Sequence, residues 1–146
     1  MHAGLLGLAA LVALSQVQAR PPLEKLKRGF SSLSNGTWEG AFREWNEEGH
    51  LSASRLEEVR GKLARLGVEA RAIGEWTAFH PALVQPLWQR HWVLATFDQG
   101  AGYFAFDFQF HKGEWRLAGL EVTGNPAELV PNLDQKSLTL RLAESR

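Results

Sequence analysis

The clearest pattern in the chain is a run of four phenylalanines that alternate with smaller or polar residues, at positions 104, 106, 108 and 110. A period of two is typical of a β-strand, because successive side chains point to opposite faces. Burying one phenylalanine is worth roughly 1.5–3 kcal/mol, so four together rival the net stability of a typical domain. The sequence therefore predicts a strand over 103–112 whose phenylalanine face is covered.

Three amphipathic helices are predicted ahead of this strand. The first begins at Pro21-Pro22, since the fixed φ of proline suits a first turn, and it ends at Asn35-Gly36. Its apolar residues recur at helical spacing, at positions 23, 26, 30 and 33. Its charged residues, Lys25 among them, are expected to face solvent.

The second and third helices are bounded by capping signals. Thr37 is expected to cap the second helix, which carries three aromatic residues on one face and stops at Gly49. Ser54 and Glu57 have the spacing of a capping box for the third helix, which Gly67 closes. All three helices precede everything with a strand pattern.

Four consecutive strands are predicted next, separated by turn signals. Lys112-Gly113 suits a tight hairpin, and we interpret Gln99-Gly100-Ala101 as a three-residue loop. The connection from His80 to Pro86 carries two prolines and is expected to be looser. The predicted strands are 68–79, 88–98, 103–112 and 114–123.

These two turns predict a register and so sort the side chains between two faces. In that register Phe108 lies opposite both Trp92 and Leu117, and Asp107 lies opposite Ala118. One face collects Trp88, Trp92, Leu94, the four phenylalanines, Trp115 and Leu117. The other face collects His91, Val93, Phe97, Tyr103, Asp107, Gln109, Arg116, Leu120 and Val122.

Helices followed by a consecutive antiparallel sheet indicate an α+β fold, in which three N-terminal helices pack on a curved sheet of about four strands. The domain is expected over 20–124, with 125–146 as a C-terminal extension. Leu138, Leu140 and Leu142 alternate within that extension. They leave open whether it forms a short edge strand or a partly ordered tail.

From Pro22 to Thr123 the chain resembles the nuclear transport factor two-like (cystatin-like) superfamily of cone-shaped domains. The resemblance rests on the element order, the aromatic strand and the hairpin that runs from Gly113 to Leu117. It implies a cone whose mouth often holds a small apolar ligand. Members of the superfamily include isomerases, dehydratases, polyketide cyclases and non-catalytic or dimerising domains, so the fold alone does not carry an activity.

The first 19 residues carry no Lys, Arg, Asp or Glu and contain an apolar stretch that ends before Val17-Gln18-Ala19. This pattern predicts a signal peptide cut after Ala19, and hence a periplasmic or secreted domain. A retained membrane anchor is the weaker interpretation, because a span needs about 20 apolar residues. The chain has no cysteine, so disulfides and thiol catalysis are excluded. Its net charge of zero argues against a nucleic-acid partner.

The mixed face suggests candidate ligand-binding residues, which are His91, Tyr103, Asp107, Gln109 and Arg116. The resemblance implies that a carboxylate inside the cone can act as a general base, and Asp107 is the weak candidate. A nearby cation lowers the pKa of a carboxyl group, and the register places Arg116 on the diagonal from Asp107. A structural or ligand-orienting ion pair is therefore favoured for Asp107. No metal-ligand spacing and no cofactor motif is found in the sequence.

Three functions remain open from the sequence. The leading hypothesis is an exported non-enzymatic domain that binds a small, partly apolar ligand or self-associates through its sheet, as in a homodimer. The second is an isomerase- or dehydratase-like enzyme in which Asp107 works with Tyr103 or His91. The third is an envelope protein-interaction module that docks through a sheet edge or through the tail near Leu138.

Overall fold

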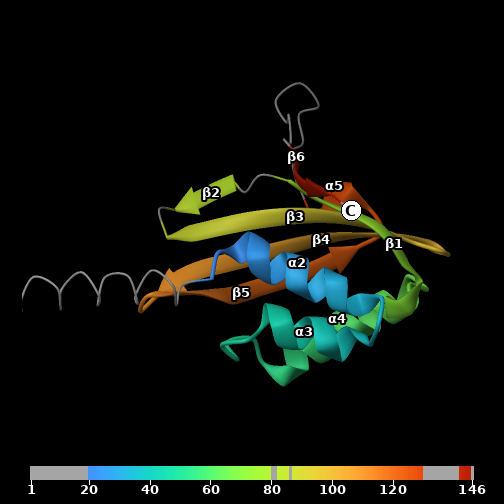
Figure 1. Cartoon of the computed structure of the whole chain (residues 1–146), viewed down its shortest axis with the longest axis horizontal. Helices are drawn as coiled ribbons and strands as arrows, with labels where there is room; N and C mark the ends of the chain where they lie inside the picture. The colour runs from blue at the N-terminus through green and yellow to red at the C-terminus, as the bar shows by residue number, and fades with distance from the viewer. Residues whose placement is uncertain (1–19, 80–81, 86, 130–141, 146) are drawn as a thin grey trace, which may run out of the picture.

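The computed structural model describes residues 20–79, 82–85, 87–129 and 142–145. The predicted signal peptide, His80 and the leucines at 138 and 140 lie outside these residues. Figure 1 shows the helices α2, α3 and α4 together on one side of the sheet. Their bounds are Pro22–Leu33, Trp38–Trp45 and Ala53–Arg65.

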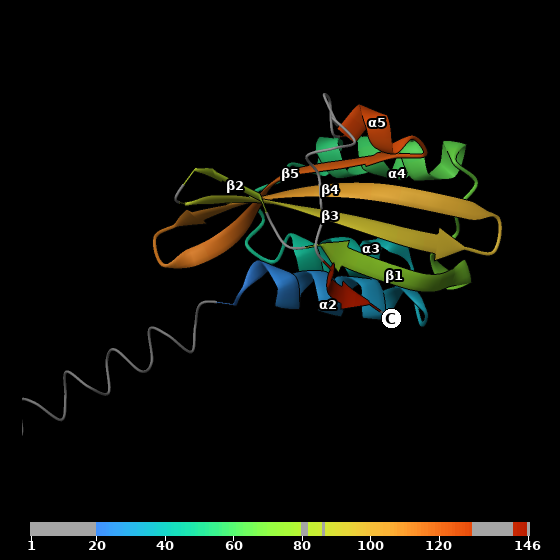
Figure 2. The ribbon, with the colours of Figure 1, turned by 90° about the horizontal axis from the view of Figure 1, so that it is seen from above.

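The sheet has four main strands, and the predicted α+β fold is confirmed. These strands are β1 (Ile73–Phe79, after a 3₁₀ turn at Ala70–Ala72), β3 (Trp88–Phe97), β4 (Gly100–His111) and β5 (Glu114–Thr123). All pairings are antiparallel, and Figure 2 shows the order β5-β4-β3-β1-β6 across the sheet. The short β6 (Leu142–Ser145) pairs with β1, and the four-residue helix α5 (Pro126–Leu129) follows β5.

The connection between β1 and β3 contains a strand that the sequence did not predict. This strand, β2 (Ala82–Gln85), pairs with the first half of β3, whereas β1 pairs with the second half. The strands β1 and β2 therefore pair with the same edge of β3, one after the other along its length. None of the described helices is long and apolar enough to cross a membrane.

Two helix predictions need correction. Lys25 is buried, with only 2% of its surface exposed, because its ammonium group forms an ion pair with Glu48 in the segment after α3. Burying a lysine is tolerable when an opposite charge accompanies it. The cap of α4 is Ser52 rather than Ser54, and its hydroxyl accepts a hydrogen bond from the backbone N–H of Arg55 at 3.2 Å.

The inner face of the sheet, which faces α2, α3 and α4, is filled with side chains. Phe104, Phe106 and Phe108 are fully buried there. Phe30 of α2 and Trp45 of α3 lie on Phe104 and Phe106, with ring centroids 4.9–6.2 Å apart. The inner face also carries Trp76, Ala78, Val93, Ala95, Phe97, Leu117, Leu120 and Val122, all buried. The covered phenylalanine face predicted from the sequence is therefore found, with Phe110 half-buried at its end.

The β3–β4 hairpin has a tighter turn than the sequence analysis expected. Phe97 pairs with Gly100, so Asp98 and Gln99 alone form the turn. His91 then lies opposite Phe106 instead of Gln109, a shift of three residues. An odd shift moves every side chain of one strand to the other face. His91, Val93 and Phe97 are consequently on the inner face, and Trp88, Trp92 and Leu94 are on the opposite one.

Gly102 explains why the turn was placed wrongly. This glycine reads as part of a flexible loop, but it lies within β4 on the inner face. A Cβ atom at this position would be 3.0 Å from the ring of Phe104 and 3.6 Å from that of Phe97. The glycine makes room for two aromatic rings inside a strand, and it does not mark the end of that strand.

A bulge in β5 accounts for the second register difference. Phe108 pairs with Leu117 as predicted, but Asp107 pairs with Gly119 and not with Ala118. The extra residue shifts the alternation of side chains by one position, so Leu120 and Val122 lie on the inner face, whereas the sequence analysis expected them on the other one. The Lys112-Gly113 hairpin agrees with its prediction, since both residues have positive φ, 49° and 81°.

Candidate functional site

Four of the five residues predicted to bind a ligand share the outer face of the sheet, which points away from α2, α3 and α4. They are Tyr103, Asp107, Gln109 and Arg116. They do not line an interior cavity, because the space under the helices is occupied by the buried aromatic core. We define the outer face by the following residues, which are Trp88, Arg90, Trp92, Leu94, Tyr103, Ala105, Asp107, Gln109, Arg116 and Glu121.

Asp107 is held by Arg90, which lies directly opposite on β3. The Nε atom of Arg90 donates to Oδ1 at 2.7 Å and its Nη2 atom donates to Oδ2 at 2.8 Å. This two-point bond raises the pKa of Arg90 above its ordinary value. Gly119 leaves the space for the carboxylate, since a Cβ there would be 3.1 Å from Oδ2. With both oxygens engaged by a cation, Asp107 is suited to an ion pair and poorly suited to proton abstraction.

Arg90 was missed because the predicted turn at 99–101 has one residue more than the observed turn at 98–99 and lies further along the chain. Arg116, the partner that the sequence register favoured, lies opposite Gln109. A search for opposite charges facing each other across β3 and β4 would have identified Arg90 and Asp107. That search succeeds only with the two-residue turn at Asp98-Gln99.

Aromatic and aliphatic side chains surround this ion pair on the outer face. Trp88 and Trp92 flank Arg90 along β3, and Leu94 pairs with Tyr103 on β4. All four are partly exposed, and the three helices α2, α3 and α4 lie on the other side of the sheet (Figure 1). The face therefore combines apolar surface with a charge pair that is already neutralised.

His91, the fifth predicted residue, belongs to the core. It is 3% exposed, and its ring meets Phe108 edge-on at 5.6 Å. Its Nε2 atom lies 3.1 Å from Oε1 of Gln89, while Nδ1 has no hydrogen-bond partner within the described part of the chain. Burial lowers the pKa of His91 to about 4, so its imidazole is neutral near pH 7.

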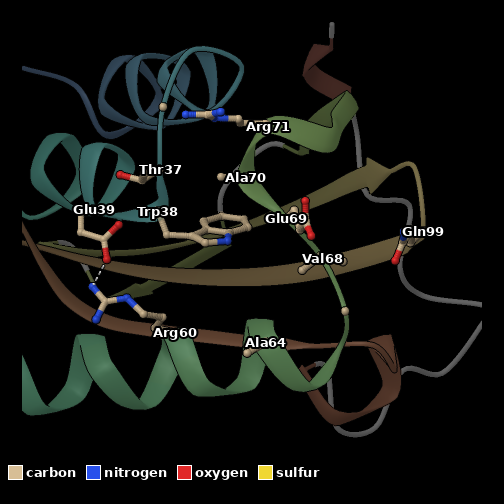
Figure 3. Close-up of a pocket in the computed structure, with 12 residues that line it drawn as sticks. Thr37, Trp38, Glu39, Arg60, Ala64, Val68, Glu69, Ala70, Arg71 and Gln99 are labelled. Carbon is tan, nitrogen blue, oxygen red and sulfur yellow. Dashed lines mark ion pairs between the residues drawn. The ribbon is translucent and has the colours of Figure 1, made fainter.

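A hollow of about 570 Å³ lies elsewhere, between the start of α3, the second half of α4 and the segment that leads to β1. Figure 3 shows the indole of Trp38 in its middle. Ala64, Val68 and Ala70 add apolar side chains to the lining of the hollow. Charged and polar groups at the rim are Thr37, Glu39, Arg60, Glu69, Arg71 and Gln99.

Two rim charges of this hollow are paired with each other. Arg60 forms an ion pair with Glu39 at 2.6 Å and a second one with Glu57, and its guanidinium carbon lies 5.8 Å from the ring centre of Phe42. The pKa of Glu39 is lowered, chiefly by a hydrogen bond from its own backbone N–H and then by the Thr37 hydroxyl. This hollow could not be predicted from the sequence, because its walls come from segments that are distant along the chain.

A metal centre finds no support in the described residues, where no three His, Asp or Glu side chains gather as ligands. Comparison of the chain with protein-family models, with curated proteins and with solved structures gives no significant match.

Proposed function

We propose that this chain is an exported, non-enzymatic domain of the nuclear transport factor two-like cone type that self-associates through the outer face of its sheet. The observation that carries the proposal is the row of partly exposed aromatic side chains around the Arg90–Asp107 pair. An aromatic patch with a satisfied ion pair at its centre resembles the core of a protein interface more than a solvated sheet.

A second copy of the chain is the partner that this composition favours. Arg90 and Asp107 neutralise each other, and the positive charge of Arg116 is balanced in number by Glu121, which lies opposite Ala105, so the face carries no net charge that would favour a strongly charged partner. The whole chain has a net charge of zero, so two copies do not repel each other. In a twofold arrangement the same patch supplies both sides of the contact, and each Trp92 meets apolar surface of the other copy.

The enzyme alternative has weaker support. An isomerase- or dehydratase-like mechanism needs Asp107 as a base, together with Tyr103 or His91, in a closed cavity. Asp107 instead accepts two hydrogen bonds from a guanidinium group on the outer face, and His91 lies on the inner face of the sheet. These side chains do not converge on a common point from which they could act on one substrate.

Sedimentation equilibrium of the purified chain over a wide concentration range tests the proposal. We expect a dimer for the wild type and at least about tenfold weaker association for Trp92→Glu, because the new charge would be buried between the copies. The control is Leu87→Glu, which places the same charge at a residue that is 56% exposed and outside the outer face. It should leave the dimer intact.

A wild-type chain that stays monomeric at every concentration would overturn self-association and favour the envelope-interaction alternative. Circular dichroism of each variant shows whether it remains folded. The same preparation tests export, because cleavage after Ala19 leaves 146 − 19 = 127 residues that begin at Arg20, a mass that intact-protein mass spectrometry distinguishes.

A further inference from the structure

We propose that the hollow beside α3 is a binding site for a small monocarboxylate with a flat apolar body. This site is separate from the outer face and does not depend on self-association. The proposal rests on three features of the hollow, which are its floor, its size and a cation that forms no ion pair with the described residues.

The floor of the hollow is the indole of Trp38. The ring packs against three phenylalanine rings, whose centroids lie 5.8–6.4 Å from its own. They belong to Phe42, Phe97 and Phe104. Trp38 is 9% exposed, and its ring N–H makes no hydrogen bond to any residue that the structure describes. Figure 3 shows this nitrogen on the side of the segment that carries Val68 and Glu69. A rigid apolar ring with one free donor suits a flat ligand that carries an acceptor.

The free cation of the hollow is Arg71. Arg60 is already engaged by Glu39 and Glu57, whereas Arg71 is exposed and forms no ion pair within the described ranges. The start of α3 already holds a negative charge, because the carboxylate of Glu39 accepts a hydrogen bond from its own backbone N–H in the first turn. Arg71 therefore is the feature that favours an anion, and a carboxylate matches the fork of its guanidinium group.

The negative groups of the rim limit the charge of that anion. Glu39 is neutralised by Arg60, but Glu69 is exposed and forms no ion pair among the described residues. Figure 3 shows Glu69 and Arg71 on either side of Ala70. A second negative charge on the ligand would approach Glu69, so a monoanion is favoured over a dianion or a phosphate.

The size of the hollow suits a compact ligand. About 570 Å³ lies within the range of small-molecule sites, roughly 300–1,000 Å³. The apolar body would cover Trp38, Val68 and Ala70, and the carboxylate would lie beside Arg71. Since the hollow opens to solvent, part of the ligand stays hydrated, and we expect a dissociation constant of about 10 μM to 1 mM.

A titration of the ¹⁵N-labelled chain with 1-naphthoate, followed by NMR, tests the inference. The indole N–H signal of Trp38, identified by its loss in Trp38→Phe, should shift as the ligand binds. The matched neutral probe is 1-naphthamide, which has the same ring without the charge. We expect naphthoate to bind about tenfold more tightly than the amide, because one charged hydrogen-bond pair is lost with the amide.

Two arginine variants separate a specific contact from general attraction by positive charge. Arg71→Gln should weaken naphthoate binding about tenfold and leave naphthamide binding unchanged. Arg65→Gln is the control, because Arg65 is an exposed arginine at the end of α4 that does not line the hollow. It should bind both probes as the wild type does.

Equal affinity for the two probes would overturn the inference, as would equal naphthoate binding by Arg71→Gln and Arg65→Gln. An unmoved Trp38 signal up to about 10 mM naphthoate would also overturn it. None of these outcomes bears on the oligomeric state, which depends on the outer face.

Discussion

Trp45 of α3 packs directly against the backbone of α2 at Gly29. The indole lies so close that a Cβ atom at Gly29 would be 1.9 Å from its Nε1 atom. On its other sides Trp45 meets Phe30 and Phe106, each with centroids 4.9 Å away. The indole of Trp45 can lie here only because residue 29 has no side chain. In a close-packed interior the ring has no space to move away from an added Cβ atom.

Gly29→Ala should therefore destabilise the fold by about 1–3 kcal/mol, as overpacked cores do. Gly61 supplies the matched control, because it also lies inside a helix but a Cβ there meets only the end of Arg65, at 3.6 Å. Gly61→Ala should stabilise by about 0.5–1 kcal/mol through helix propensity. Urea unfolding of the two variants measures this contrast, and equal signs for both changes would contradict it.

At the scale of elements, the pairing of β3 with β4 decides which side chains meet. The two-residue turn places Arg90 opposite Asp107, and the bulge in β5 places Gly119 on the other side of that carboxylate. The ion pair is therefore a product of two strand registers. It is not a local feature of either strand.

A double-mutant cycle between Arg90→Gln and Asp107→Asn tests this register. The Arg90 side chain is 36% exposed, so solvent screening limits the expected coupling to about 0.5–1 kcal/mol. The control cycle pairs Asp107→Asn with Arg116→Gln, the partner that the sequence register favoured. Its coupling should stay below about 0.3 kcal/mol. A larger coupling in the control cycle, measured by thermal unfolding, would refute the observed register.

At the scale of the whole molecule, three helices and one face of the sheet enclose a single aromatic core. His91 is buried within it as a neutral imidazole, in contact with Phe108 and Gln89, neither of which titrates. Its pKa is about 4 when folded, against 6.5 for a free histidine, because burial opposes the charged form. Between these two pH values the unfolded chain binds a proton that the folded chain does not.

The free energy of unfolding should therefore fall as the pH drops from 6.5 to 4, with a contribution from His91 of up to roughly 3 kcal/mol. Above pH 6.5 this stabilisation is fully present, and below pH 4 the loss is complete. His91→Gln removes the titrating group, so its unfolding free energy should fall less steeply over that window. Parallel pH profiles of wild type and variant, from urea unfolding, would contradict the assignment.

The sequence alone determined the three helices, the four main strands and the covered face of the sheet, but not β2. The helical spacing in the first half predicted α2, α3 and α4, and the alternation around Phe106 predicted a strand with one buried side. These features are local, because the period of a pattern depends only on neighbours along the chain. The Lys112-Gly113 turn was predicted correctly for the same reason, since its positive φ values are encoded within two residues.

Only the tertiary structure decided which residues share a face. In the sequence Gly102 has the pattern of a loop residue, and only its contacts with the rings of Phe97 and Phe104 explain why a strand contains glycine here. Nothing in the local sequence pattern identifies Ala118 as the extra residue of a bulge. From the sequence Lys25 is expected at the surface, and only the tertiary structure places Glu48 beside it as the partner that allows its burial. Contacts between distant segments also decide three further features. These are the side of the sheet on which His91 lies, the ion-pair partner of Asp107 and the hollow over Trp38. A pattern of period two gives alternation but not its phase, and the phase is set by how the strands pair.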